Sequence, residues 1–199
     1  MELLNRINNI LEKPIKIKPK NLFFRLFTSK NVTISLFNTI QSDKPLSDHT
    51  ILHETQHYID RCTKVDGIYK SNFLTQIWWY FKYTTPQILS LISLLSILSI
   101  WYSNLFLISL SSLIFLLPLP AFASFRYKIE LRGYFWNYLF DVKLDYSKIF
   151  SGMLYYGMDD SNSSRHYKME FDRMLCVNVY KDDDNMKDLF KIYSEYINI

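Results

Sequence analysis

The chain has 199 residues, enough for one ordinary domain and too few for two domains with separate cores. Its 23 basic and 19 acidic residues give a formal charge of +4 and are spread along the chain, so no nucleic-acid partner is expected, because such binding needs basic residues gathered on one face. Cys62 and Cys176 lie far apart and predict neither a disulfide framework nor a CxxC motif.

The first part of the chain predicts short helices and strands. A short amphipathic helix opens it. Apolar and polar residues alternate over 32–36, which predicts a strand, and a second short strand is predicted over 23–27. A capping residue at position 47 or 48 then predicts a helix that extends to about residue 62.

Residues 83–125 contain no Asp, Glu, Lys or Arg. A bilayer crossing takes about 20 helical residues at about 1.5 Å each, so this stretch predicts a transmembrane helical hairpin with legs at 86–102 and 105–123. Basic residues flank both outer ends, which predicts a multi-pass membrane protein with both termini in the cytoplasm. The alternatives are a helical hairpin buried in a soluble core, which the many serines favour, and one tilted crossing.

After this stretch the pattern is again that of helices. One is predicted over 125–142, another near 146–156, and an amphipathic helix closes the chain from residue 184 or 185. The predicted fold class is mostly α with a small β element (α+β). The predicted organisation has residues 1–82 and 126–199 as the two parts of one catalytic domain, interrupted by the hairpin of residues 83–125.

The sequence HETQH, His53 to His57, lies on the helix predicted over 48–62. Residues four apart share one face of a helix, so His53 and His57 can bind the same Zn²⁺ through their imidazoles. Glu54 lies beside that face, where it can act as a general base on a zinc-bound water whose pKa is about 7. This is the HExxH arrangement of zinc peptidases. The alternative is a surface helix that carries two solvated histidines.

A catalytic zinc needs a third protein ligand. His49 is eight residues before His57, about 12 Å along a helix, and so is too far away to share the ion. Glu130, on the helix predicted over 125–142, is the favoured candidate. Glu170, with His166 nearby, is a weaker rival.

The HExxH helix, the hydrophobic stretch and a later R-x-x-x-E-x-x-(small) segment together resemble the integral-membrane gluzincins of the CAAX prenyl protease and heat-shock membrane protease type. This resemblance implies a zincin-like catalytic domain. It also implies that His53, His57 and Glu130 bind zinc and that Glu54 is the general base.

Four residues near the implied ligands bear on this resemblance. Arg126 matches the arginine four residues before the glutamate, and Gly133 matches the small residue three after it. Tyr134 stands where the family has an aspartate that holds a zinc-ligating histidine. Asp60, one turn past His57, is a candidate to take over that task, and its alternative is a surface charge.

The expected function is that of a zinc metalloendopeptidase, anchored in the lipid bilayer with its active site on the cytoplasmic side. Its substrate would be a peptide or protein, and the strand over 32–36 could offer an edge to it. The oxyanion candidates are His166, Tyr134 and Tyr156. One alternative is a non-enzymatic membrane hairpin protein with a structural or vestigial zinc site, and another is a soluble zinc peptidase whose hairpin is a lid.

Overall fold

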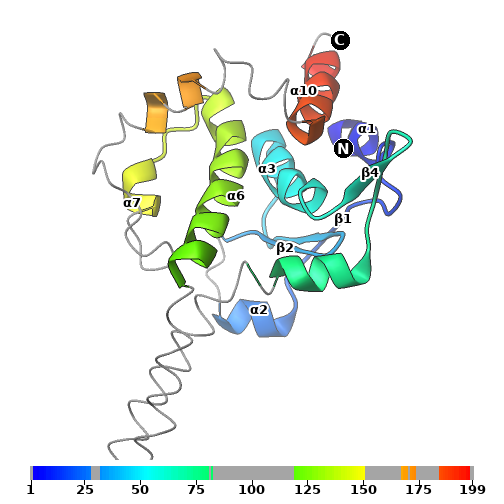
Figure 1. Ribbon diagram of the computed structural model, residues 1–199, viewed down its shortest axis with the longest axis horizontal. Helices are drawn as coiled ribbons and strands as arrows, with labels where there is room; N and C mark the ends of the chain where they lie inside the picture. The colour runs from blue at the N-terminus through cyan, green and yellow to red at the C-terminus, as the bar shows by residue number, and fades with distance from the viewer. Residues whose placement is uncertain are drawn as a thin grey trace, which may run out of the picture. The chain divides into compact units, whose positions relative to one another are not determined.

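The computed structural model describes residues 2–27, 32–80, 82, 119–150, 167–169, 171–173 and 184–197. This part of the chain is mostly helical with two small sheets (Figure 1). The chain divides into two compact units. One comprises Met1–Gln76, Ile129–Leu144 and Arg165–Ile199, and the other comprises Ile77–Lys128 and Asp145–Ser164.

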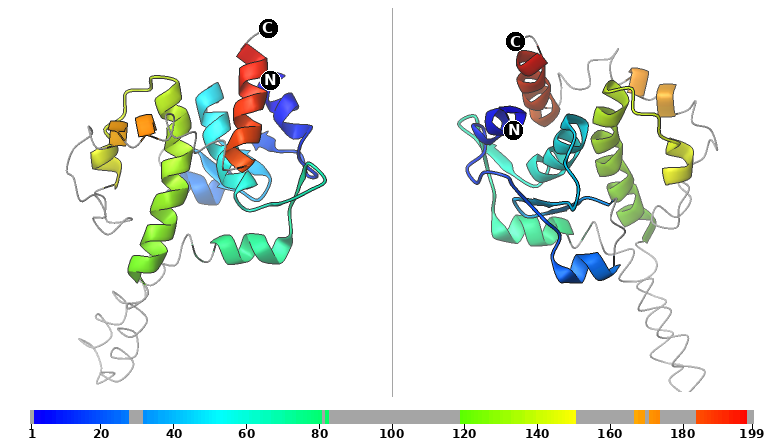
Figure 2. Two further views of the ribbon diagram at one scale, coloured as in Figure 1. Left: turned by 45° about the horizontal axis from the view of Figure 1, so that its top comes forward. Right: turned by 180° about the vertical axis from the view of Figure 1, so that it is seen from behind.

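Helices enclose the core of the first unit. They are α1 (Glu2–Asn8), α3 (Asp48–Ile59), α10 (Asp184–Ile197) and the part of α6 (Leu119–Leu139) that follows residue 128. Helix α3 lies between α6 and α10 (Figures 1 and 2). The fully buried side chains of this core include Leu3, Ile7, Leu52, Ile59, Trp136 and Leu189, all at most 1% exposed. Burial of such side chains, about 1.5–3 kcal/mol each, stabilises the unit.

A three-stranded sheet packs beside α3. Its strands are β1 (Lys16–Lys18), β2 (Ile34–Leu36) and β3 (Thr39–Gln41), in the order β1-β3-β2. Strand β3 runs parallel to β1 and antiparallel to β2. Arg61, just past the end of α3, donates to Ser35 Oγ at 2.9 Å and to the Phe37 carbonyl at 3.2 Å. Strand β2 therefore lies at a sheet edge and is fastened to the end of α3.

Two hairpin turns in this unit contain residues with left-handed backbone. A hairpin of β4 (Thr63–Val65) and β5 (Ile68–Lys70) turns at Asp66 and Gly67, whose φ angles are 53° and 78°, and Asp-Gly is the pair that such a turn favours. The turn between β2 and β3 instead places Phe37 at φ 50°. The left-handed conformation raises the free energy of a residue with a side chain by roughly 1–2 kcal/mol relative to the right-handed one.

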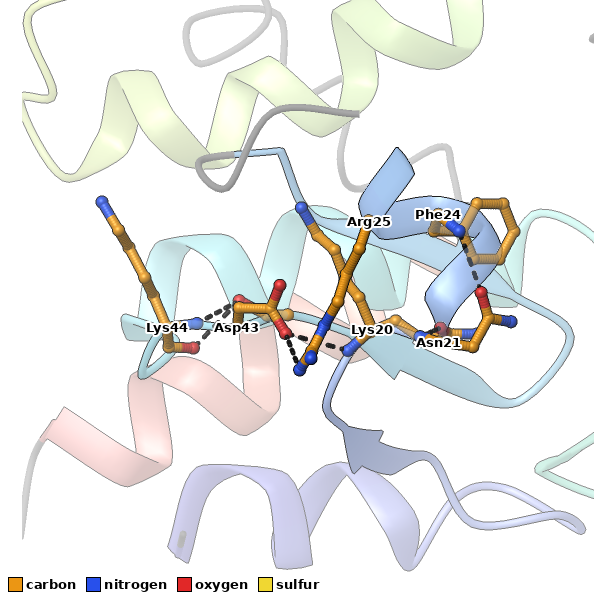
Figure 3. Close-up of polar contacts among 8 residues, drawn as sticks. Lys20, Asn21, Phe24, Arg25, Asp43 and Lys44 are labelled. Carbon is orange, nitrogen blue, oxygen red and sulfur yellow. Dashed lines mark hydrogen bonds and ion pairs between the residues drawn. The ribbon is translucent and has the colours of Figure 1, made fainter. Parts of the chain in front are cut away.

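The strand predicted over 23–27 is wrong, because this segment forms helix α2 (Leu22–Phe27). Asn21 caps it, since its Oδ1 accepts from the Phe24 amide at 3.0 Å. Asp43 accepts from the Lys20 amide at 3.2 Å and from the Arg25 guanidinium at 2.9 Å (Figure 3). These polar contacts decide the conformation of an aromatic-rich segment whose composition favours a strand.

The predicted transmembrane hairpin is contradicted by the structure. Among the described residues, no helix combines the length and the apolar character needed to cross a bilayer. The longest of them, α6, has 21 residues but carries four charged side chains: Arg126, Lys128, Glu130 and Arg132. The membrane anchor and the multi-pass localisation predicted from residues 83–125 are corrected accordingly. Residues 83–118 of that prediction lie outside the described residues.

Aromatic contacts organise the described part of the second unit. The rings of Trp79 and Phe125 lie 6.0 Å apart, and Tyr127 lies 4.9 Å from Phe150 on α7 (Tyr146–Phe150). The helix predicted near 146–156 is thus present over 146–150, and its remainder lies outside the described residues. The first half of α6 and α7 therefore pack together within this unit.

Candidate metal centre

The amphipathic pattern of α3 separates a core face from a polar face. Leu52 and Ile59, seven residues apart, are 0% exposed in the core. His53 and His57, four residues apart, occupy the other face. The helix predicted over 48–62 is confirmed, with bounds Asp48–Ile59 and Ser47 as its N-cap. The burial of the apolar face in the core fixes the direction in which the two histidines point.

Helix α6 carries the rest of the site on one stripe. Glu130, Gly133, Tyr134 and Asn137 recur at intervals of three and four residues, so they lie on the same side of the helix. Gln56 and Trp136 hold this helix to α3 through a hydrogen bond of 3.2 Å from Trp136 Nε1 to Gln56 Oε1. Two helices far apart in sequence therefore present their polar stripes to each other.

His53, His57 and Glu130 converge at this contact. The Oε2 atom of Glu130 lies 3.7 Å from Nε2 of His53 and 3.6 Å from Nε2 of His57. The histidine rings stand nearly perpendicular, with centroids 4.7 Å apart. One donor atom from each residue lies within 4.8 Å of the others, so the three residues form a group that could hold a metal ion.

The donor set is one that divalent metal ions, zinc among them, can bind. Two imidazoles and one carboxylate are a known ligand set for catalytic zinc, and bonds of about 2.0–2.1 Å in a tetrahedron separate donor atoms by roughly 3.4 Å. The distances of 3.6 and 3.7 Å from Glu130 Oε2 to the two histidine nitrogens are close to that value, whereas the three donor atoms as a set lie within 4.8 Å of one another. Three protein ligands leave a fourth position for water or substrate, as catalytic zinc sites do.

Asn137 orients the first histidine. Its Oδ1 lies 2.9 Å from Nδ1 of His53, and because a carboxamide oxygen can only accept, Nδ1 donates the hydrogen. This places the lone pair of the neutral ring on Nε2, the atom that faces Glu130. Asn137 is not among the residues predicted from sequence, although its position seven residues after Glu130 places it on the same stripe of the helix.

Gly133 provides the space for the His53 ring. A Cβ atom at this position would lie 2.8 Å from Nε2 and 2.9 Å from Cε1 of His53. Such distances are shorter than real Cβ contacts allow, so only glycine permits this approach of the ring to α6. The small residue three positions after Glu130 therefore has a direct steric function in the site.

Burial and the neighbouring charges shift the pKa values of His53 and Glu130 in opposite directions. Burial alone lowers the pKa of His53, but the neighbouring Glu130 carboxylate, the charge of Glu54 and the bond to Asn137 together raise it above its ordinary value. Burial alone raises the pKa of Glu130, but His57 and His53 outweigh it and hold that pKa well below its ordinary value. The carboxylate is therefore ionised at neutral pH and ready to bind a cation.

Glu54 lies next to the group and is 9% exposed. Within the described residues, no hydrogen bond or ion pair engages its carboxylate, whereas the Glu130 carboxylate faces both histidines. The Glu54 carboxylate is therefore not committed to a structural contact within the described part of the chain.

Asp60 and His49 serve other contacts. The Asp60 carboxylate pairs with Arg132 at 2.9 Å and accepts from Gln56 Nε2 at 2.8 Å, so it joins α3 to α6 one turn away from the histidines. His49 packs its ring against Phe140, with centroids 5.7 Å apart. Neither residue belongs to the group of three ligands.

Of the other site residues predicted from sequence, Tyr134 and Arg126 lie among the described residues. Tyr134 packs edge to face on the His53 ring, with centroids 4.8 Å apart. Arg126 is half-buried on the part of α6 that belongs to the second unit. The oxyanion candidates His166 and Tyr156, and the rival ligand Glu170, lie outside the described residues.

No family model, curated protein or solved structure matches this chain. The resemblance to the integral-membrane gluzincins therefore stays a prediction drawn from the motif residues.

Proposed function

We propose that this chain is a zinc-dependent peptidase in which His53, His57 and Glu130 bind the ion and Glu54 is the general base. The observation that carries the proposal is the convergence of the HExxH histidines with a carboxylate from a separate helix, within 3.7 Å of both imidazoles. An accidental pair of surface histidines would have no reason to be buried against such a carboxylate.

The chain's own residues supply most of the proposed mechanism. A zinc ion held by these ligands would polarise a substrate carbonyl and lower the pKa of water. Glu54 would take a proton from that water on its carboxylate and deliver it to the departing amine. Asn137 would keep the Nε2 lone pair of His53 directed at the ion.

The position of β2 supports a peptide as substrate. This strand lies at the edge of the described sheet and is fastened to the end of α3 by Arg61. An edge strand can pair with an extended peptide through backbone hydrogen bonds. A peptide bound along β2 would therefore be attached to the element that carries both histidines.

The substitution Glu54→Gln tests the proposal. Zinc content, measured by elemental analysis, should equal that of the wild type, because Glu54 is not a ligand. Hydrolysis of unfolded casein should fall by about 10²–10⁴-fold, the usual contribution of a general base. A variant that binds zinc and cleaves casein as fast as the wild type would show that Glu54 is not the base. Wild-type protein that binds zinc without cleaving any peptide library would instead indicate a structural site.

A further inference from the structure

A second feature lies on the outer face of the three-stranded sheet. Thr39 and Gln41 on β3 point to one face, while Ile40 between them is 1% exposed in the core. The register aligns Leu36 with Thr39 and Lys18 with Gln41, so all four side chains share the outer face. They line a cavity of about 450 Å³, a volume in the range of about 300–1,000 Å³ that small-molecule sites occupy.

Phe37 lines the cavity and has a left-handed backbone conformation, which is unfavourable for a bulky side chain. Its φ of 50° lies at a two-residue hairpin turn, where glycine is the favoured residue and a bulky side chain is an outlier. The ring is nevertheless 37% exposed and stacks on Phe73, with centroids 6.2 Å apart and planes 12° from parallel. Strain that keeps an aromatic ring at the surface indicates a function for the ring beyond folding.

The charged side chains around the cavity are all basic. Lys13 and Lys18 line it, and no lining residue is acidic. Lys13 Nζ lies 3.5 Å from the Ser71 carbonyl, and among the described residues no carboxylate forms an ion pair with Lys18. A second cavity of similar size, near α1 and α10, differs because Asp188 and Glu195 line it together with its basic residues.

We propose that the cavity lined by Phe37 and Phe73 binds an organic anion. The aromatic or other apolar part of the ligand packs on the exposed rings of Phe37 and Phe73. Its carboxylate, sulfonate or phosphate group pairs with Lys13 and Lys18, and Asn38 and Thr39 offer hydrogen bonds at the rim. None of the cavity's lining residues belongs to the group of His53, His57 and Glu130, but Leu36 of β2 lines it, so the cavity adjoins the edge proposed to bind a peptide.

Binding of 8-anilino-1-naphthalenesulfonate, followed by its fluorescence, tests the proposal in the full chain. Phe37→Gly should weaken binding at least five-fold and leave the thermal midpoint equal or higher, because glycine relieves the strained φ. Lys18→Gln should weaken binding of the sulfonate by a similar factor. It should not affect N-phenyl-1-naphthylamine, which has the same rings without the charge.

Lys187→Gln is the matched control, because it removes one exposed lysine from α10, outside the cavity. Sulfonate binding by this variant should equal that of the wild type. The proposal is overturned if Phe37→Gly and Lys18→Gln both bind the sulfonate as tightly as the wild type. It is also overturned if Lys187→Gln weakens binding as much as Lys18→Gln does, since net charge alone would then explain the effect.

Discussion

Nδ1 of His53 lies 2.9 Å from Oδ1 of Asn137, so the orientation of a histidine on α3 depends on an amide on α6. Asn137→Leu keeps a similar volume but removes the acceptor, and the ring is then free to rotate or change tautomer. Loss of such a partner typically weakens metal affinity by about 10–100-fold. Competition for zinc against a chromophoric chelator would measure the change.

The matched control is Asn137→Asp, which keeps an acceptor at the same position. Its affinity for zinc should equal or exceed that of the wild type, because a carboxylate makes the imidazole a stronger ligand. Asn137→Leu with wild-type affinity would show that the hydrogen bond does not orient the ring. The unfolding midpoints of both metal-free variants would identify any loss of affinity that comes from a damaged fold.

The three residues of the candidate metal group could be predicted from sequence, but the contacts that orient them could not. The HExxH spacing alone pairs His53 with His57, since four residues make about one helical turn. Glu130 could be chosen because it is one of six glutamates and lies on the helix predicted directly after the uncharged stretch. Asn137 and Asp60 depend instead on how α3 and α6 rotate against each other, and side-chain spacing along one helix does not contain that information. The rotation gives the orienting contact to Asn137 and pairs Asp60 with Arg132.

Gly133 gives a prediction that separates steric fit from helix stability. Gly133→Ala should raise the intrinsic helix propensity of α6 by up to about 1 kcal/mol, but its Cβ would lie 2.8 Å from Nε2 of His53. The ring must move, so zinc affinity should fall at least ten-fold. The helical circular dichroism signal should stay unchanged.

Gly67→Ala is the contrasting variant. Nothing lies within 4 Å of a Cβ at Gly67, but its φ of 78° strains any residue with a side chain. This variant should lose roughly 1 kcal/mol of stability in denaturant titrations while its zinc affinity stays unchanged. Equal losses of affinity in both variants would mean that general destabilisation, and not the contact with His53, controls metal binding.

Asp60 provides a test of the contact that joins α3 to α6. Its side chain is 2% exposed and accepts from both Arg132 and Gln56. Asp60→Asn keeps the shape but loses the charge-assisted bond, so stability should fall by about 1.5–3 kcal/mol in urea titrations. Zinc affinity should change far less than in Asn137→Leu. An equal loss of affinity would show that Asp60 acts on the ligands after all.

Local pattern misled the sequence analysis in two places, for different physical reasons. Aromatic residues from 23 to 27 favour a strand, but the Asn21 cap and the Asp43 contacts stabilise one and a half turns of helix. The expectation of a membrane anchor came from the uncharged stretch 83–125. The described end of that stretch instead continues into α6, which carries four charged side chains, and no described helix is long and apolar enough to cross a bilayer.

Cys62 gives a pH-dependent prediction that does not involve the metal. Burial raises the pKa of its thiol to about 11, and the Sγ atom donates to the Tyr58 carbonyl at 3.3 Å. Because only the thiolate reacts with iodoacetamide, the folded protein at pH 7.5 should be alkylated at Cys62 about 300-fold more slowly than the urea-unfolded chain, whose thiol has its ordinary pKa near 8.5. The rate should rise about ten-fold per pH unit up to pH 9 in the folded protein. Mass spectrometry of the peptide that contains Cys62 would separate its reaction from that of Cys176. Equal rates in the folded and unfolded chains would show that the end of α3 opens readily, and would remove the basis for a rigid histidine pair one turn before it.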